Sequence, residues 1–382
     1  MPVAFSPSTR PSRASAKLEY CLAKLPTSPR IRDAIARIKI AYERDLFPWV
    51  IGYSGGKDSS AVLKLVFHAL RLVECHHKLV SVIYCDTGVE LPVAADLARG
   101  VMSGFQKECS DHGLPVSTKI LQPRLRDRYF VKVIGRGYPP PTDKFRWCTD
   151  RLRINPVSDF IRSVDAGDAV VLLGVRQDES STRRLTLKEN SGENRFWKRQ
   201  KKHAGRQLFM PIIDFTIEDV WRALLTLPTP YSVRGDRVAD LYSAAAGECP
   251  TVRDPVSPPC GAARFGCWNC TVAKKTETLD HLALTHGSRY QRLRDYRVWL
   301  LASRNDEDFR WKRRRNGQPG LGPMTIEWRR TALDRLLALQ TETGFSLITH
   351  DEIEEIRAMW QKERRTAGRP TMASAEPEQR AS

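Results

Sequence analysis

The stretch between Val50 and Val66 constrains the fold of this chain more than any other. An apolar run, VIGY, is followed by SGGKDSS and then by AVLKLV. We interpret this order as a buried strand, a tight loop and a helix that begins near Lys57. Adjacent glycines let backbone N–H groups surround an anion, and the positive end of a helix dipole attracts the same charge. The sequence therefore predicts a phosphate-binding loop. Its residues are Ser54, Gly55, Gly56, Lys57, Asp58, Ser59 and Ser60.

The spacing within this loop excludes two common phosphate-binding motifs. The Walker loop needs G-x-x-x-x-G-K-[ST], and the dinucleotide-binding loop needs G-x-G-x-x-G. Neither pattern matches the stretch. A Gly-Gly hairpin with an incidental lysine is the purely structural alternative.

Composition limits the class of protein. The 382 residues carry a formal charge of +18 and the pI is about 9.7, which favours a polyanionic partner such as nucleic acid. A chain that is simply rich in arginine would look the same. No apolar run approaches the roughly 20 residues that span a bilayer, and the N-terminus lacks a secretory segment. We therefore expect a cytoplasmic protein with no membrane partner.

Further strands are expected along the chain. Residues 79–85, 116–121 and 168–175 are rich in β-branched and apolar side chains, and residues 31–42 have the spacing of a helix. Strands that alternate with helices predict a parallel, doubly wound sheet, in which ligands bind at the carboxyl ends of the strands.

Polar residues follow two of these strands. Asp86 follows the second strand, where it either borders a bound nucleotide or caps a turn. Gly174 closes the fourth strand. Arg176 and Arg183 then offer planar forks to phosphate oxygens, and Glu179 is placed to hold one of them. A solvated salt-bridge face is the alternative for this last group.

Four of the nine cysteines crowd into residues 249–270. Disulfides are rare in a reducing compartment, so the cluster indicates a metal site. Four thiolates suit either zinc or an iron–sulfur cluster, and spacing alone does not choose between them. Four reduced structural cysteines are the alternative. The candidate ligands are Cys249, Cys260, Cys267 and Cys270.

A further cysteine, Cys148, lies in the segment KFRWCTDRLRINP. Three roles stay open for it: a thiol that carries or receives sulfur, an additional cluster ligand, or a packed side chain. If Lys144, Arg146 and Arg151 face this thiol, they lower its pKa and favour the thiolate.

Two basic segments carry aromatic residues. Residues 188–207 include Phe196 and Trp197, and residues 310–317 read RWKRRRNG. Both patterns suit contact with the phosphates and bases of a single nucleic-acid strand. A plain mobile loop in the first case and a solvated face in the second are the alternatives.

Several of these motifs together resemble a known family. SGGKDS resembles the PP-loop of ATP pyrophosphatases and of phosphoadenylylsulfate reductases. DTGVELP, the WCT segment, GVRQDESSTR and CGAARFGCWNCTV extend the resemblance over most of residues 45–300 to the DndC/SspD-type ATP pyrophosphatases of DNA phosphorothioation. The resemblance implies a Rossmann-like adenine nucleotide α-hydrolase (HUP) fold, α/β with helices on both faces of a parallel sheet, plus a Cys-rich cluster-binding region and C-terminal helices.

The same resemblance implies cofactors, partners and roles. ATP, Mg²⁺ and a [4Fe–4S] cluster on Cys249, Cys260, Cys267 and Cys270 are expected, with zinc as the less favoured metal. Lys57, Asp58 and Cys148 are the expected catalytic residues. The partners implied are DNA, a cysteine desulfurase and other proteins of the phosphorothioation system, as in restriction-modification.

Three other functions fit parts of the sequence. A phosphoadenylylsulfate reductase normally carries a C-terminal E-C-G-x-H motif, and the nearest string here, ECSDHGL from Glu108, is in the wrong place. A tRNA thiolase shares the PP-loop, the basic charge and a cluster. A scaffold that recruits a desulfurase without catalysis has no need of Lys57 and Asp58.

The expected organisation has five parts. A disordered arm (1–16) precedes the nucleotide-binding domain (17–235), in which Thr216 caps a helix together with Asp219. A Cys-rich region (236–285), a helical region (286–367) and a disordered tail (368–382) follow. Helices are expected over residues 281–301, 325–341 and 351–362.

Overall fold

The computed structural model describes residues 28–164, 169–177, 195–199, 207–246, 265–273 and 276–367. The expected arm (1–16) and tail (368–382) lie outside these ranges. Within the described residues, no helix combines the length and the apolar character that crossing a membrane requires. The elements in chain order are α2 (Pro29–Glu43), β1 (Trp49–Tyr53), α3 (Lys57–Leu70), β2 (Val80–Cys85), α4 (Pro92–Asp111), β3 (Val116–Leu121), η1 (Leu125–Asp127), η2 (Val131–Gly135), α5 (Trp147–Thr149), η3 (Asp150–Ile154), α6 (Asn155–Val164), β4 (Val170–Leu173), β5 (Trp197–Arg199), β6 (Gln207–Phe209), α8 (Ile217–Thr226), α9 (Gly235–Ala246), α10 (Glu277–Thr285), α11 (Ser288–Ser303), η5 (Glu307–Phe309), α12 (Ile326–Thr343) and α13 (His350–Ala367).

Six strands form one sheet in the order β3-β2-β1-β4-β6-β5. Every neighbouring pair is parallel except β5 and β6, which are antiparallel. The chain moves outward from β1 to β3 and then crosses to β4 on the other side of β1. The order reverses between β1 and β4, which is where doubly wound sheets bind ligands. The predicted α/β fold with a mostly parallel sheet is confirmed.

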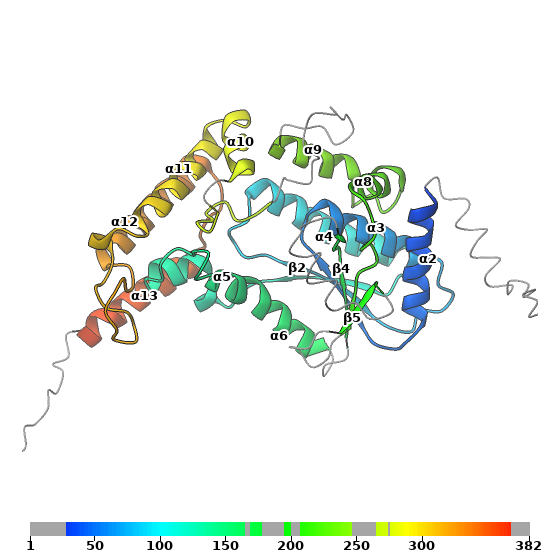
Figure 1. Ribbon diagram of the computed structural model, residues 1–382, viewed down its shortest axis with the longest axis horizontal. Helices are drawn as coiled ribbons and strands as arrows, with labels where there is room; N and C mark the ends of the chain where they lie inside the picture. The colour runs from blue at the N-terminus through cyan, green and yellow to red at the C-terminus, as the bar shows by residue number, and fades with distance from the viewer. Residues whose placement is uncertain are drawn as a thin grey trace, which may run out of the picture.

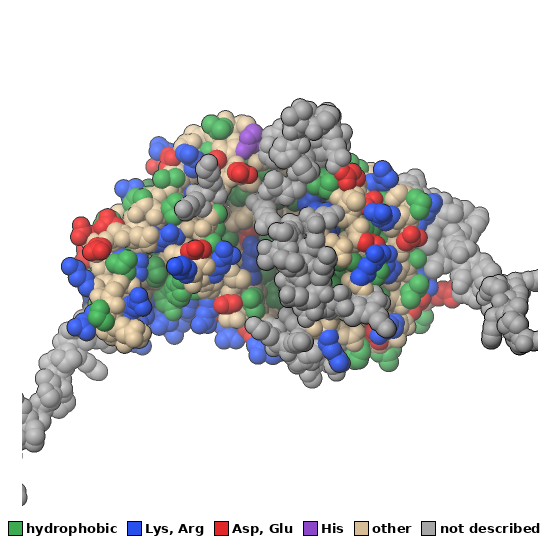
Figure 2. Space-filling model, viewed as in Figure 1, with side chains coloured by type: hydrophobic (Ala, Val, Ile, Leu, Met, Phe, Trp, Pro, Cys, Tyr) green, Lys and Arg blue, Asp and Glu red, His purple; other side chains and the backbone are tan. Residues whose placement is uncertain are grey.

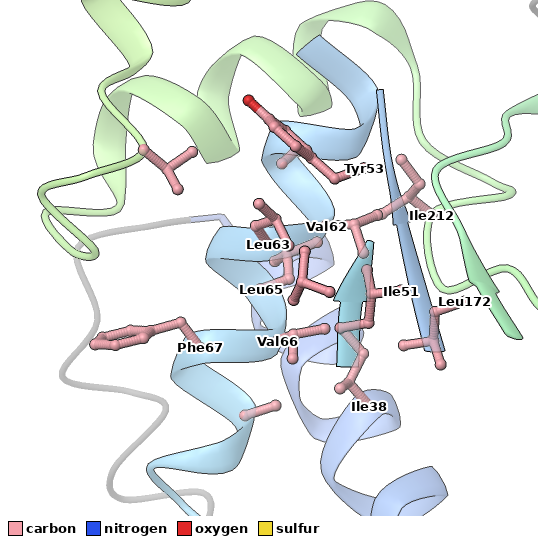
Figure 3. Close-up of a cluster of buried hydrophobic side chains, with 14 of the residues drawn as sticks. Ile38, Ile51, Tyr53, Val62, Leu63, Leu65, Val66, Phe67, Leu172 and Ile212 are labelled. Carbon is pink, nitrogen blue, oxygen red and sulfur yellow. The ribbon is translucent and has the colours of Figure 1, made fainter. Parts of the chain in front are cut away.

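The central strands are buried because helices cover both faces of the sheet (Figure 1). Successive side chains of β1 point to opposite faces. Ile51 packs in a core with α2, α3, α4 and α8, and Val50 packs with α6 on the other side. In Figure 3, Val62 and Val66 of α3 point toward Ile51, and Phe67 points away from the sheet. The strand β1 and the helix α3, which flank the predicted loop, are thus held together by packed apolar side chains.

A buried lysine joins α3 to the end of α8. The Lys64 ammonium donates to the carbonyl oxygens of Leu224 (2.9 Å) and Leu227 (2.6 Å), and burial lowers its pKa to about 8. The start of α8 is also fixed: the Thr216 hydroxyl accepts from the Asp219 amide, and the Asp219 carboxylate accepts from the Thr216 amide. The predicted cap on Thr216 is confirmed.

A second core lies among the C-terminal helices. Trp268, Leu293 and Trp328 pack there together with Phe130 and Trp147, which come from the segment between β3 and α6. That segment therefore leaves the sheet and joins the helical unit, seen on the left of Figure 1. The five-part division of the chain stays a prediction.

Two of the three helices predicted in this region are confirmed as α12 and α13. The single helix predicted over residues 281–301 is wrong. The structure has α10 and α11 instead, separated by Gly287 at a φ of +83°. A left-handed glycine ends one helix and redirects the chain.

Candidate functional site

The SGGKDSS loop joins the carboxyl end of β1 to the first turn of α3. Gly55 has a φ of +77°, and a Cβ there would lie 3.3 Å from the Cβ of Ala98. The Ser59 hydroxyl donates to the Gly56 carbonyl (3.0 Å) and accepts from the Ser54 amide (3.2 Å). Its single proton is thereby used, so the Ser54 hydroxyl, 3.0 Å away, is the donor between the two. Ser59 therefore shapes the loop from within, and Ser54 is the exposed hydroxyl.

Two buried cations share one carboxylate at this loop. The Lys57 ammonium lies 2.8 Å from Asp58 Oδ2, and Arg176 Nε lies 2.6 Å from Asp58 Oδ1. Both cations have little solvent exposure. Two positive charges against one negative charge leave a net positive site at the start of α3, where the helix dipole adds to it. The predicted loop residues and Arg176 are thus brought together, although Gly174 and Arg176 are more than a hundred residues away in sequence.

Gly174 is needed for this approach. A Cβ at this position would lie 2.9 Å from the carbonyl carbon and oxygen of Asp58 and from the amide nitrogen of Ser59. Real side chains do not come this close to backbone, so the end of β4 can touch the loop only as glycine. Glu179 and Arg183, the other residues of that motif, lie outside the described residues.

Tyr242 on α9 contacts the loop, and it was not predicted from the sequence. Its hydroxyl accepts from the Lys57 amide (3.2 Å), and its ring centroid lies 5.3 Å from the Lys57 ammonium. The two residues are 185 positions apart. Nothing in the local pattern around Tyr242 distinguishes it from other aromatic residues on a helix.

Asp86, at the end of β2, is buried and forms a turn. Its Oδ1 accepts from the Gly88 amide (3.0 Å), and its Oδ2 lies 3.0 Å from Arg99 Nη2. Gly88 has a φ of +76°, as such a turn requires. Of the two expectations for Asp86, the structure supports the turn, and its contact with a nucleotide stays a prediction.

The CWNC segment lies against the end of the same strand. Glu90 forms an antiparallel bridge with Cys267, and the Trp268 amide donates to the Val89 carbonyl (3.0 Å). On the other side, Arg297 of α11 donates to the Cys270 carbonyl (2.7 Å). The two cysteines therefore stand between the carboxyl end of β2 and the helical core.

Cys148 interacts electrostatically with Cys267 and Cys270. Burial raises the pKa of the Tyr129 hydroxyl, and Tyr296, Cys148, Cys267 and Cys270 act in the same direction. The condition for a lowered pKa of Cys148, that its basic neighbours face the thiol, is not met: burial raises the pKa, and Cys270 adds to the effect. Arg151 instead lies 3.8 Å from Asp127.

Two thiols, on Cys267 and Cys270, and nearby buried polar groups without partners in the described part of the chain have a donor chemistry that fits a thiolate-bound metal. Asn269 is fully buried, and neither atom of its amide has a hydrogen-bond partner among the described residues; the same holds for the Tyr129 hydroxyl. Such groups normally have a partner. The described residues contain no group of three or more His, Cys, Asp or Glu that could hold a metal ion. The other two candidate ligands, Cys249 and Cys260, lie outside the described residues.

The aromatic residues of the first basic segment are used internally. The Trp197 ring stacks on Phe209 with centroids 4.5 Å apart, and Arg37 covers the Phe196 ring at 3.6 Å. They pack because β5 pairs with β6 at the sheet edge. The contact of these two rings with nucleic-acid bases stays a prediction. Most of residues 188–207 lies outside the described residues.

A mostly parallel sheet with a glycine-rich loop at its point of strand reversal defines the class, a doubly wound α/β protein. The family can also be stated. The model of the phosphoadenosine phosphosulfate reductase domain matches residues 48–273, which include every strand of the sheet, and the chain belongs to this family.

Individual relatives are distant. An uncharacterized protein of Methanocaldococcus jannaschii is 29% identical over 201 residues, which are 53% of this chain and 36% of that protein. The chain thus spans about a third of that relative's length.

Two solved structures show weak similarity. A phosphoadenylyl-sulfate reductase from Candida auris, in a phosphate complex, is 13% identical, with a TM-score of 0.32 over 59% of this chain and 91% of that one. The U34-tRNA thiolase of Methanococcus maripaludis with its [4Fe-4S] cluster is 14% identical, with a TM-score of 0.33 over 56% of this chain and 73% of that one. Both scores are too low to support an argument about activity.

Proposed function

We propose that this protein is an ATP pyrophosphatase that activates the DNA backbone by adenylylation, so that sulfur can be incorporated as a phosphorothioate. The observation that carries the proposal is the bridge between Glu90 and Cys267. It holds a pair of thiols at the carboxyl edge of the sheet that also bears the phosphate loop. Nucleotide activation and sulfur chemistry are the two halves of a thiolation reaction, and this fold holds candidate residues for both.

In the proposed reaction the phosphates of ATP lie on the loop between Ser54 and Ser60. A non-bridging oxygen of a DNA phosphate attacks the α-phosphorus, and the bond to the bridging oxygen breaks with its electron pair on pyrophosphate. Lys57, Arg176 and the loop amides offset the charge that develops on this leaving group. The terminal sulfur of a persulfide formed by a cysteine desulfurase then attacks the adenylylated DNA phosphorus, and AMP departs with the oxygen. A thiol reductant cleaves the remaining S–S bond, which leaves the phosphorothioate on DNA and a disulfide as the other product.

Asp58 has a positioning role in this scheme. Its two carboxylate oxygens are already engaged by Lys57 and Arg176, so it orients both cations toward the phosphates. Mg²⁺ would therefore be held chiefly by ATP oxygens, where it neutralises negative charge.

The metal centre would be held by Cys267 and Cys270 together with Cys249 and Cys260, and a [4Fe–4S] cluster there would supply sulfur relay or a rigid support for the DNA-facing surface. Cys148 is close enough to interact electrostatically with Cys270. Receipt of sulfur by Cys148 stays part of the proposal.

The structure offers no nucleophile for a reductase in the ECSDHGL string. Cys109 is fully buried, and burial raises its pKa to about 12. Glu108 accepts hydrogen bonds from the Tyr231 and Ser232 amides and so fixes a turn. A buried thiol of raised pKa does not attack an external sulfonate.

The test is an anaerobic thiolation assay. The purified protein is incubated with ATP, Mg²⁺, a cysteine desulfurase and ³⁵S-cysteine, with either DNA or tRNA as acceptor. We expect label in DNA that nuclease digestion releases as resistant phosphorothioate dinucleotides. Label confined to tRNA would replace the proposal with a tRNA thiolase, and AMP release with no label in either acceptor would refute thiolation.

A further inference from the structure

The connection between α11 and α12 forms a well-ordered turn structure that carries a run of positive charge. We call residues 310–324 the basic hairpin. Arg310 pairs with Met324 and Arg313 pairs with Pro319 in antiparallel bridges. Backbone bonds continue between the two arms, from the Gly320 amide to the Lys312 carbonyl (3.1 Å) and from the Trp311 amide to the Pro323 carbonyl (2.9 Å).

One arginine stabilises the base of the hairpin from within. Arg310 is buried, and its guanidinium donates to the carbonyl oxygens of Gly322 (2.6 Å), Leu321 (3.1 Å) and Arg304 (2.8 Å). A Cβ on Gly322 would lie only 1.9 Å from the Arg313 carbonyl oxygen. The arms are thus held close together by backbone bonds and by Arg310, and the Arg313 guanidinium adds one bond at the tip, to the Gly317 carbonyl oxygen (3.3 Å).

The charged residues that follow Arg310 face solvent. Lys312, Arg313 and Arg314 are exposed and have no ion-pair partner among the described residues, and no Asp or Glu occurs between residues 309 and 326. Trp311, at the start of the run, is 53% exposed. A fixed set of cations without acidic partners, next to an exposed aromatic ring, is suited to a polyanion that also has flat bases.

The hairpin is attached to the segment that leads to Cys148. The Met324 amide donates to the Gly137 carbonyl (2.8 Å), and the Arg315 guanidinium lies 5.7 Å from the Tyr138 ring centroid. Tyr138 in turn contacts the ring of Trp147, the neighbour of Cys148. Figure 2 shows Lys and Arg side chains gathered along the lower edge of the half of the molecule that holds these helices.

We infer that the basic hairpin is a docking surface for a single nucleic-acid strand. Lys312, Arg313 and Arg314 contact successive phosphates, and a base stacks on Trp311. The choice of nucleic acid as the partner rests in part on the proposed function. The strand is thereby led toward the segment that carries Cys148.

Binding to fluorescein-labelled oligo(dT) and oligo(U) tests the inference, measured by anisotropy without ATP so that the result does not depend on turnover. The triple variant Lys312→Gln, Arg313→Gln, Arg314→Gln is compared with Lys107→Gln, Lys119→Gln, Arg222→Gln, which removes the same charge from exposed positions on the sheet domain. We expect the hairpin triple variant to reduce the magnitude of the negative slope of log K against the logarithm of the salt concentration by about 2, at roughly 0.7 per lost phosphate contact. The control triple should change it little.

Trp311→Ala supplies an independent readout. We expect a loss of affinity of about tenfold with an unchanged salt slope, because stacking releases no counterions. Equal losses in the two triple variants, or no loss in the hairpin variants, would overturn the inference. If the hairpin variants bind more weakly as expected but the wild type transfers no sulfur, the docking surface stands and the proposed function is rejected. The comparison of oligo(dT) with oligo(U) identifies whether DNA or RNA is preferred.

Discussion

Single residues set the geometry of the phosphate loop, and Gly174 shows this most directly. The end of β4 touches the backbone of Asp58 and Ser59, and this contact positions Arg176 against the Asp58 carboxylate. The sequence marked the glycine as part of a motif. It could not show that the motif meets the loop backbone, because that contact depends on the pairing of β1 with β4.

Gly174→Ala tests this contact. The added methyl group would displace the loop, so we expect ATP turnover to fall at least tenfold, with a loss of stability of about 1–3 kcal/mol from overpacking. Gly100→Ala is the matched control, because Gly100 lies on α4 with no atom within 4 Å of the added Cβ. It should be neutral or stabilising by about 0.5–1 kcal/mol. The rate at which AMP is produced measures turnover, and urea unfolding measures stability. Normal turnover in Gly174→Ala would contradict this role of the contact.

The pKa and the hydrogen-bond partners of a side chain were harder to predict where burial determines them. The basic neighbours of Cys148 suggested a thiolate, but the side chain packs against the helical core and burial dominates. Ser59 and Asp58 were predicted as phosphate-facing groups. The structure shows Ser59 bonded within the loop and Asp58 bonded to two cations, contacts that residue type alone does not reveal.

At the scale of elements, local pattern was a good guide to long segments and a poor one to short segments. The positions of β1, β2, β3 and β4 followed from apolar runs between turn signals. The strands β5 and β6, of three residues each, were missed because so short a run has no detectable period. The break at Gly287 was missed because helical spacing continues on both sides of it.

The packing of α3 against the end of α8 predicts a pH dependence of stability. His68 on α3 lies 3.0 Å from the Thr229 carbonyl oxygen through Nε2, which must carry the proton. Burial lowers its pKa to about 4, and Arg71 and Lys64 act in the same direction. The unfolded chain, with a histidine pKa near 6.5, binds a proton first as the pH falls. Stability is therefore lost between about pH 6.5 and 4, by up to about 3 kcal/mol.

His68→Gln isolates this contribution, since glutamine can still donate to Thr229 but does not titrate. Urea unfolding at about pH 7 and about pH 4.5 should show a smaller loss of the free energy of unfolding in the variant than in the wild type. The Asp and Glu carboxylates contribute equally to the pH dependence of unfolding in both proteins, so their contribution cancels in the comparison. Identical losses in the two proteins would mean that His68 is not held neutral.

At the scale of the whole molecule, two cores meet at the candidate site. The sheet carries the phosphate loop, and the helical unit holds the CWNC segment through Arg297. The fold class could be predicted from the sequence because each strand and helix is encoded locally. The bridge from Glu90 to Cys267 and the contact of Tyr242 with Lys57 could not, since they join segments far apart in the chain.

We propose that the loop at the carboxyl end of β1 cleaves ATP between the α- and β-phosphates. The most direct measurement is anaerobic incubation with α-³²P-ATP, separating AMP from ADP, with iron content recorded on the same sample. We predict AMP and pyrophosphate from the wild type and from Lys39→Ala, whose lysine pairs with Glu43 on the same helix, α2, and no AMP from Lys57→Ala. ADP and phosphate as the products, or undiminished AMP from Lys57→Ala, would contradict the account.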